Sequence, residues 1–525
     1  MCGIVGYAGN IETACGKPLE VCLQGLERLE YRGYDSAGVA LTAPGMDKVV
    51  VRKKAGRLKN LVEDIERKPM PLATVGIGHT RWATNGEPSD VNAHPHTSMD
   101  GKVAIIHNGI IENASQLRFD LQAEGYRFAS ATDTEVAAKL LGKIVDKIIA
   151  DEGKPDLFKA VRRMARMLEG AFTILATDCR QPDIVVGARH DSPLVVGLGE
   201  GENFLGSDVA AFVAYTKRAM EVDQDQAVCV SADKVIVADF NGNVVENPKT
   251  YTVDWDASAA EKGGWDSFMD KEIHEDPAAV QRTLLGRFDT NGDITLDEVR
   301  IDEHDFKAID KIIVVACGTA SYAGQVAKYA IEHWVRIPVE IELAHEFRYR
   351  DPILTPRTLV VAISQSGETM DTLMALRHAR EQGSKVLAIC NTQGASIPRE
   401  SDAVLYTHAG PEVAVASTKA FVAQITAAYL LGLYLAQVKG AMFRDEIHQM
   451  LDSLKDMPRK IQWVLDTQPK TIQAAAERMV NANSFLFLGR HVGFPVAMEG
   501  ALKLKEITYI HAEGFAAGEL KHGPI

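Results

Sequence analysis

The pattern of hydrophobic and polar positions changes about halfway along the chain. Residues 1–240 contain many short apolar runs bounded by turn residues, which predict β-strands. Two stretches, Leu19–Leu26 and Val136–Ile144, have apolar residues at helical spacing instead. Such a mixture predicts an α+β domain in which helices cover antiparallel sheet. The predicted strands are Ile4–Tyr7, Val39–Leu41, Val49–Arg52, Val75–His79, Val103–His107, Phe172–Thr177, Ile184–Gly187, Leu194–Gly197 and Val228–Ala238.

The second half alternates apolar strands with helices. Residues 241–305 are weakly apolar and rich in Asp, Gly and Lys, and we interpret them as a linker with a few short helices. Residues 306–445 then alternate strand and helix, which predicts a doubly wound parallel sheet. The predicted elements are strands Ile312–Ala316, Val339–Leu343, Thr358–Ser364 and Lys385–Cys390, and helices Ser321–Trp334, Thr369–Gln382 and Lys419–Val438.

Residues 446–525 start the same alternation again. A helix predicted over Pro458–Met479 is followed by an apolar strand, Phe485–Gly489, and a further helical stretch. This segment resembles the start of a second α/β domain that has too few residues to complete a sheet. We therefore expect an incomplete second domain, with its C-terminus missing.

Composition excludes several classes of protein. The 525 residues are 46% hydrophobic with a net charge of −14 and no long basic run, which argues against nucleic-acid binding. No run of about 18 apolar residues occurs, so no membrane span is expected. The seven cysteines are scattered without a CxxC pair. We expect a cytoplasmic chain with reduced cysteines and no metal site.

Cys2 follows the initiator Met1, and it is the strongest candidate nucleophile. Removal of Met1 would place a thiol and a free α-amine on one residue. The amine can act as the base that activates the thiol, so acyl transfer would need no separate His or Lys.

Polar residues between the core strands offer partners for such a nucleophile. Asn108 can supply a side-chain N–H to an oxyanion, and Gly109 a backbone N–H. Arg81 can bind a carboxylate with its planar fork, and Asp133 can bind an amine. The alternatives are a surface ion pair for Arg81, a helix N-cap for Asp133 and a hairpin turn at Asn108-Gly109. For three other polar residues we favour structural or hydrogen-bonding roles over metal binding: His79, His94 and His96.

The ordered segments of the first half resemble the N-terminal-nucleophile (class II) glutamine amidotransferases. They are Cys2-Gly3-Ile4, His79-Thr80-Arg81-Trp82-Ala83-Thr84, His107-Asn108-Gly109 and Thr132-Asp133-Thr134-Glu135. The resemblance implies an αββα sandwich in which Cys2 attacks the amide of glutamine. It also implies that Asn108 and Gly109 hold the oxyanion. The residues implied in glutamine binding are Arg81, Trp82, Thr84 and Asp133.

Hydroxyl-rich turns follow the predicted strands of the second half. Ser364-Gln365-Ser366-Gly367-Glu368-Thr369 follows a strand and opens a helix, and Thr319 and Ser417 occupy similar positions. Their hydroxyl and N–H groups at helix N-termini suit a phosphate, whereas the alternative is that they are ordinary helix caps. Further along, Glu499, Lys503 and Glu506 share one helix face, either for proton transfer or as an exposed ion-paired surface.

These segments resemble the sugar-isomerase (SIS) half of the glutamine–fructose-6-phosphate aminotransferase (isomerising) family. The resemblance also includes Val415–Lys419, Glu499–Glu506 and Gly518–Pro524. It implies a sugar-phosphate site made by Thr319, Ser364, Gln365, Ser366, Thr369 and Ser417. It implies Glu506 as the proton-transfer base, Lys503 as its assistant and His522 as the group that opens the sugar ring.

The resemblance implies that ammonia from glutamine converts fructose 6-phosphate into glucosamine 6-phosphate, in a homodimer without metal or organic cofactor. Ammonia would travel through a closed passage to the second half. Two alternatives keep part of this picture. The first is another class II amidotransferase with a different acceptor, for which the sequence offers no phosphoribosyl or adenylating motif. The second is a non-catalytic SIS sugar-phosphate sensor.

Overall fold

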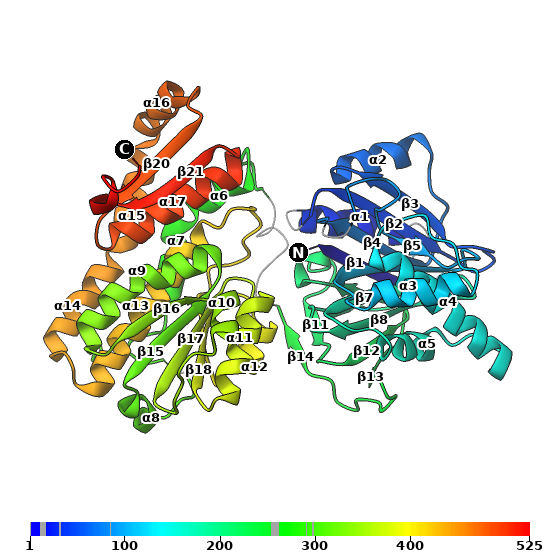
Figure 1. Cartoon of the computed structure of the whole chain (residues 1–525), viewed down its shortest axis with the longest axis horizontal. Helices are drawn as coiled ribbons and strands as arrows, with labels where there is room; N and C mark the ends of the chain where they lie inside the picture. Colours follow the sequence, from blue (N-terminus) through cyan, green and yellow to red (C-terminus); the bar gives the residue numbers. More distant parts are fainter. Residues whose placement is uncertain are drawn as a thin grey trace. The chain divides into compact units, whose positions relative to one another are not determined.

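A computed structural model of the chain describes residues 2–10, 17–30, 33–83, 86–253, 262–289, 291–296 and 299–524. Contacts divide the chain into two units, Met1–Glu261 and Lys262–Ile525. Each unit has its own sheets and core (Figure 1). The finer division at residues 240, 305 and 445 stays a prediction.

Two antiparallel sheets form the middle of the first unit. The eight-stranded sheet has the order β14-β11-β9-β10-β1-β4-β2-β3, and the six-stranded sheet has the order β13-β12-β8-β7-β6-β5. The strands are β1 (Gly3–Gly9), β2 (Ser36–Thr42), β3 (Val50–Ala55), β4 (Val75–Arg81), β5 (His96–Thr97), β6 (Val103–Gly109), β7 (Phe172–Asp178), β8 (Gln181–His190), β9 (Val195–Leu198), β10 (Glu202–Gly206), β11 (Arg218–Glu221), β12 (Gln226–Val230), β13 (Val235–Asp239) and β14 (Thr250–Thr252).

Alternating side chains divide the first unit into layers. In β1, Ile4 lies in the core between the sheets, whereas Val5 and Tyr7 join the core that contains helix α1 (Lys17–Leu29). In β6, Ile106 faces the inter-sheet core and Ile105 the opposite helical layer. The helices of this unit are α1, α2 (Leu58–Arg67), α3 (Ala114–Ala123), α4 (Asp133–Glu152) and α5 (Leu157–Ala165). The predicted αββα sandwich is confirmed.

One predicted strand is wrong. The run Val228–Ala238 is a hairpin of two strands, β12 and β13, because the polar residues Ser231–Lys234 form a turn between them. The Ser231 N–H donates to the Lys234 carbonyl at 2.8 Å, and its Oγ accepts the Lys234 N–H at 3.2 Å. The chain therefore reverses direction within what looks like one apolar run.

A five-stranded parallel sheet organises the second unit, with the order β16-β15-β17-β18-β19. Its strands are β15 (Lys311–Ala316), β16 (Val339–Leu343), β17 (Thr358–Ser364), β18 (Lys385–Cys390) and β19 (Ala403–Tyr406). Ile312 and Val314 face one helical layer and Ile313 and Val315 the other, so both faces are covered (Figure 1). The doubly wound sheet is confirmed.

Helices precede, cover and follow this sheet. Those before it are α6 (Phe268–His274), α7 (Asp276–Leu284) and α8 (Glu303–Ala308). Those connected to its strands are α9 (Gly318–Val335), α10 (Ala344–Arg350), α11 (Met370–Glu381), α12 (Ser396–Glu400) and α13 (Lys419–Lys439). By length and composition alone α13 could cross a membrane, but 61% of its most apolar window is buried inside the structure, as in the core helix of a globular domain.

The last part of the chain holds more helices than predicted. The stretch Pro458–Met479 is two helices, α15 (Met457–Thr467) and α16 (Pro469–Met479), because Pro469 cannot continue a helix from Gln468. Helix α14 (Arg444–Lys455) was not predicted.

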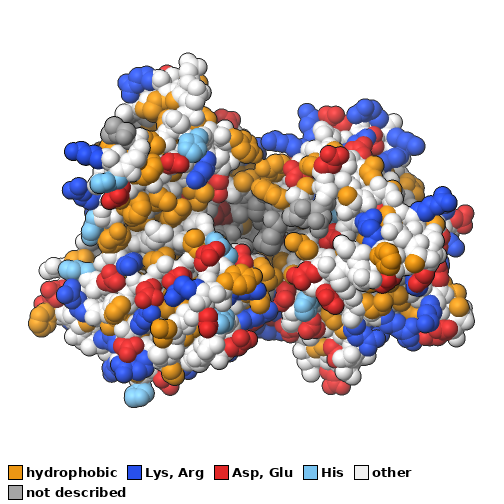
Figure 2. Space-filling view, in the orientation of Figure 1, with side chains coloured by type: hydrophobic (Ala, Val, Ile, Leu, Met, Phe, Trp, Pro, Cys, Tyr) orange, Lys and Arg blue, Asp and Glu red, His pale blue; other side chains and the backbone are white. Residues whose placement is uncertain are grey.

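A small βαβ unit ends the described chain. Strands β20 (Ser484–Gly489) and β21 (His511–Ala516) pair in parallel, and helix α17 (Gly493–Thr508) connects them. Large hydrophobic side chains remain exposed here, and Figure 2 shows such side chains gathered over α15 and α17. The exposed residues include Trp463, Leu486, Leu488, Val496 and Ile507.

Candidate active sites

The Cys2 thiol lies beside the end of β4. Gly3 in β1 pairs with Thr80 in β4, and this register brings Trp82 next to Cys2. The Trp82 N–H donates to Sγ at 3.2 Å, and the thiol lies 3.6 Å from the Trp82 carbonyl oxygen. Burial raises the pKa of the Cys2 thiol, although the Trp82 N–H and the charge of Arg81 act against this shift. The thiol must therefore lose its proton to a base before it can attack a carbonyl.

Asn108 is positioned from both ends of its amide. Its Nδ2 donates to the Cys2 carbonyl oxygen at 2.7 Å, and its Oδ1 lies 3.0 Å from His79 Nε2. The same Nε2 lies 3.0 Å from the His107 carbonyl oxygen. Two acceptors at one nitrogen indicate that Nε2 carries the proton of His79. Burial lowers the pKa of His79 to about 3, so the ring is neutral and holds Asn108 with its N–H groups toward Cys2.

Gly109 ends β6 in a conformation that only glycine adopts without strain. Its φ is +118°, and a Cβ there would lie 2.0 Å from the Ala171 carbonyl oxygen. Asn108-Gly109 is therefore the end of a strand paired with β7, and the alternative of a hairpin turn is wrong.

Arg81 and Asp133 share the electrostatic environment of Cys2. Arg81 is only 4% exposed, and its Nη2 donates to the Gly86 carbonyl at 3.2 Å, which excludes the alternative of a surface ion pair. Burial lowers the pKa of Arg81, and Cys2 and Asp133 act against this shift. The structure thus brings the predicted nucleophile, cation and anion together.

Asp133 is the first residue of α4 rather than its cap. The N-cap is Thr132, whose side chain accepts the Glu135 N–H. The Oδ2 of Asp133 accepts the Ile111 N–H at 3.0 Å. Asp133 is therefore held by the loop after β6, and the alternative of an N-cap is wrong.

Four other residues of the first unit were candidates for the site or its surroundings: Trp82, Thr84, His94 and His96. The Trp82 side chain is 44% exposed and packs edge-on against Tyr34. Thr84 lies outside the described residues. The His94 ring packs against the His79 ring at a tilt of 35°, and His96 Nε2 lies 3.0 Å from Thr132 Oγ1. Burial lowers the pKa of both rings. The contacts of His94 are ring contacts with His79 and His96, which suit a structural role.

A cavity of about 160 Å³ opens at the carboxyl ends of β15 and β17. β15 and β17 are neighbours in the sheet, but helix α9, which follows β15, and helix α11, which follows β17, cover opposite faces. Such a point is where α/β sheets commonly bind ligands. All six predicted phosphate residues line the cavity: Thr319, Ser364, Gln365, Ser366, Thr369 and Ser417.

Hydroxyl groups shape the turn that enters this cavity. Ser364 Oγ accepts the Gly367 N–H at 3.1 Å and lies 3.1 Å from Thr369 Oγ1. Thr369 is the N-cap of α11 but makes no side-chain cap hydrogen bond, and Thr319 lies inside α9. Helix capping therefore does not account for these two hydroxyls, and both face the cavity.

A polar network joins α17 to the same cavity. Lys503 Nζ donates to Thr319 Oγ1 at 2.9 Å and to Glu506 Oε2 at 2.7 Å. Thr319 in turn donates to Glu499 Oε1 at 3.0 Å, and burial raises the pKa of Glu499 to about 7. Lys503 thus contacts a residue of the cavity and is ion-paired with both Glu499 and Glu506, of which Glu506 is exposed. The proton-transfer role and the ion-paired surface both stay predictions. His522 is exposed and, in the part of the chain described, does not line the cavity.

Comparisons with known proteins match both halves of the chain. A family model described as a glutamine amidotransferase domain matches residues 79–214, and one described as a SIS domain matches residues 306–434. The chain is similar to glutamine–fructose-6-phosphate aminotransferases (isomerizing) from Corynebacterium diphtheriae, at 62% identity, and Corynebacterium efficiens, at 63%. Both matches cover 100% of this chain and 83% of the relative.

A solved structure is also similar. The C-terminal domain of glucosamine-fructose-6-phosphate aminotransferase from Francisella tularensis matches with a TM-score of 0.49 and 42% identity, over 50% of this chain and 73% of that one. On the strength of the full-length sequence matches, this chain belongs to the glutamine–fructose-6-phosphate aminotransferase (isomerizing) family.

Proposed function

We propose that this chain takes ammonia from glutamine at Cys2 and transfers it to fructose 6-phosphate at the cavity beside β15 and β17, which yields glucosamine 6-phosphate. The observation that carries the proposal is the meeting of Cys2 with Asn108 and Arg81 in a chain that matches this family over its whole length. The family membership disfavours both an acceptor of another kind and a non-catalytic sensor.

Glutamine cleavage begins when the α-amine of Cys2, freed by loss of Met1, accepts the thiol proton. The sulfur attacks the side-chain amide carbon, and the oxyanion accepts hydrogen bonds from Asn108 Nδ2 and the Gly109 N–H. The amine returns the proton to the departing nitrogen, which leaves as ammonia. Water then hydrolyses the thioester to glutamate. The glutamine itself is held by Arg81, Trp82, Thr84 and Asp133.

The acceptor reaction needs a phosphate site and a proton carrier. The Ser364–Thr369 turn, Thr319 and Ser417 offer the hydroxyl and N–H donors for the phosphate. Ammonia condenses with the C2 ketone, and water leaves as the imine forms. Glu506 removes a proton from C1 and returns one to C2, with Lys503 as its partner, and His522 opens the sugar ring. The proposed steps use no metal or organic cofactor.

A Cys2→Ala variant tests the proposal. It should release no glutamate from glutamine yet bind fructose 6-phosphate as the unaltered chain does, because the two sites lie in different units. Cys229→Ala, which removes another thiol of the first unit, is the matched control and should keep its glutaminase activity. An unaltered chain that binds sugar phosphate but never hydrolyses glutamine would indicate the sensor instead.

We also propose that the chain acts as a cytoplasmic homodimer. The described cysteines are free, which suits a reducing compartment, and the exposed hydrophobic residues of α15, β20 and α17 suit an association. Sedimentation equilibrium of the purified protein tests the dimer: a mass of one chain at all concentrations contradicts it.

A further inference from the structure

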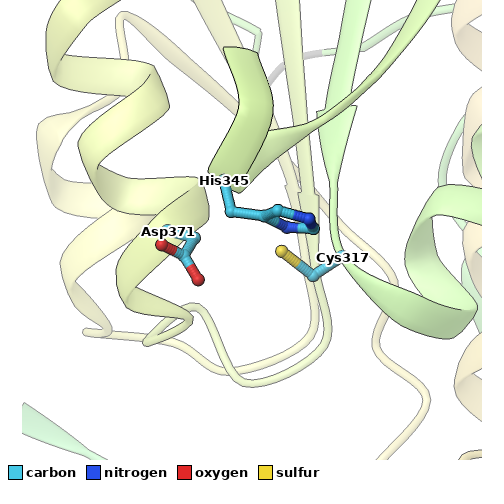
Figure 3. Close-up of side chains that lie close together, drawn as sticks. All are labelled: Cys317, His345 and Asp371. Atoms are coloured by element: carbon cyan, nitrogen blue, oxygen red, sulfur yellow. The ribbon is translucent and has the colours of Figure 1, made fainter. Parts of the chain in front are cut away.

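Three potential metal ligands meet at the carboxyl edge of the parallel sheet. Cys317 directly follows β15, His345 is the second residue of α10 after β16, and Asp371 is the second residue of α11 after β17. The strand order β16-β15-β17 makes these three strands neighbours, so their following segments emerge side by side. Figure 3 shows the three side chains gathered around one space.

The distances are close to those of a metal site. One ligand atom from each residue, the sulfur, a ring nitrogen and a carboxylate oxygen, lies within 4.8 Å of the other two. Ligands bonded to a tetrahedral zinc ion at about 2.0–2.3 Å lie about 3.3–3.8 Å from one another. Small rotations of the side chains would close this difference. The Asp371 side chain is exposed and that of His345 is 45% exposed, so both are able to move and an ion can enter from solvent.

The surroundings suit a cation that carries two charges. A thiolate at Cys317 and the carboxylate of Asp371 would together neutralise such an ion. The Oε1 of Glu346 lies 3.7 Å from His345 Nε2 and adds negative charge beside the imidazole. The Thr372 hydroxyl lies 3.9 Å from the Cys317 sulfur and can donate to it.

We propose that Cys317, His345 and Asp371 bind a borderline-soft divalent cation of the Zn²⁺ class, with water at a fourth position. Thiolate and imidazole ligands favour Zn²⁺ or Co²⁺ over Mg²⁺ and Ca²⁺, which prefer oxygen. Binding releases the thiol proton to solvent as the metal–sulfur bond forms. Cys317 also lines the proposed sugar-phosphate cavity, so the metal site would adjoin that cavity. None of the three ligands has a role in the proposed reaction.

Co²⁺ is the probe that tests this site in the full-length protein. Tetrahedral Co²⁺ bound to a thiolate absorbs in the near ultraviolet through charge transfer, and competition with Zn²⁺ removes this absorption. We expect the band in the unaltered protein and its loss in Cys317→Ser. We expect His345→Ala and Asp371→Asn to weaken Zn²⁺ binding at least about tenfold.

Matched variants separate this site from other ligands. Cys2→Ser removes the candidate nucleophilic thiol of the first unit and should leave the band unchanged. Asp351→Asn should leave Zn²⁺ affinity unchanged, because its exposed carboxylate lies outside the cluster. A band that survives Cys317→Ser, or that disappears in Cys2→Ser, overturns the proposal, and so does a folded protein without any thiolate band. Because the readout is an absorption band, failure of the proposed enzyme activity does not affect it.

Discussion

The Nε2 atom of His79 lies 3.0 Å from the Oδ1 atom of Asn108, and this contact determines which way the Asn108 amide points. The N–H groups of the amide are thereby directed to the Cys2 carbonyl. The imidazole is buried, and its pKa is lowered to about 3, so the contact persists throughout the neutral pH range. His79 is thus a positioning residue for the proposed oxyanion site.

Replacement of Asn108 or His79 should reduce glutamine hydrolysis mainly through kcat. Asn108→Ala removes an oxyanion donor, which costs about 10²–10³ in kcat. His79→Ala should cost less, because the amide remains but is free to rotate. Steady-state glutamate release measures both effects. His190→Ala, in the same unit, is the control, and an unchanged kcat in His79→Ala would contradict the positioning role.

Changes at Arg81 and Asp133 should raise the KM for glutamine. Arg81→Lys keeps the charge but loses the planar fork, and Asp133→Asn loses the charge for the substrate amine. A hydrogen bond to a charged group contributes about 1.5–3 kcal/mol, which corresponds to about tenfold or more in KM. Arg52→Lys, at a partly exposed site on β3, is the control. The KM for glutamine is measured from the rate of glutamate release. A KM within twofold of that of the unaltered chain in both variants would contradict these roles.

The double variant Ser366→Ala, Thr369→Ala should weaken binding of fructose 6-phosphate. Both hydroxyls line the cavity, and Thr369 makes no competing cap hydrogen bond. Loss of two hydrogen bonds of about 1 kcal/mol each corresponds to roughly a tenfold or larger loss of affinity. Isothermal titration calorimetry measures it, with Ser453→Ala on α14 as the control. Unchanged affinity in the double variant would place the phosphate elsewhere.

Stability of the second unit should fall as the pH rises from about 4.5 to about 7. Glu272 Oε1 accepts the Val413 N–H at 2.6 Å, and burial raises the pKa of Glu272 to about 7. Between these two pH values Glu272 keeps its proton in the folded state and loses it in the unfolded state. Above about pH 7 both states have lost the proton, and stability falls no further on this account. The contribution of Glu272 is on the order of 3 kcal/mol.

Glu272→Gln tests this pH dependence, because its uncharged amide can still accept the same hydrogen bond. Differential scanning calorimetry at about pH 5 and about pH 8 should show a smaller loss of stability in the variant than in the unaltered chain. Equal losses in the two proteins would mean that other groups are responsible. Asp276, whose pKa burial also raises to about 7, is the first such group to replace.

Much of the fold could be predicted because strands and helices have different apolar periods. β15 and β17 are solid apolar runs, and the structure places both in the interior of a parallel sheet. The hairpin between β12 and β13 was missed because Ser231–Lys234 has neither Gly nor Pro to mark the turn. Strands of two to four residues, such as β5 and β11, are too short to show a period.

The candidate sites were predictable where the chemistry is visible in single residues or in a hydroxyl-rich turn that follows a strand. Cys2, Arg81 and Asp133 carry groups whose roles follow from their types. The orientation of Asn108 by His79 depends on strands that pair over long sequence distances, so no local pattern reports it. Cys317 and His345 likewise meet only because β15 and β16 are neighbours in the sheet.

The mass of the intact chain, quenched with acid while it hydrolyses glutamine, tests the role of Cys2 most directly. We predict a γ-glutamyl thioester on molecules that lack Met1, and no such adduct in Cys2→Ala. An adduct on molecules that retain Met1, or one that persists in Cys2→Ala, would contradict the account.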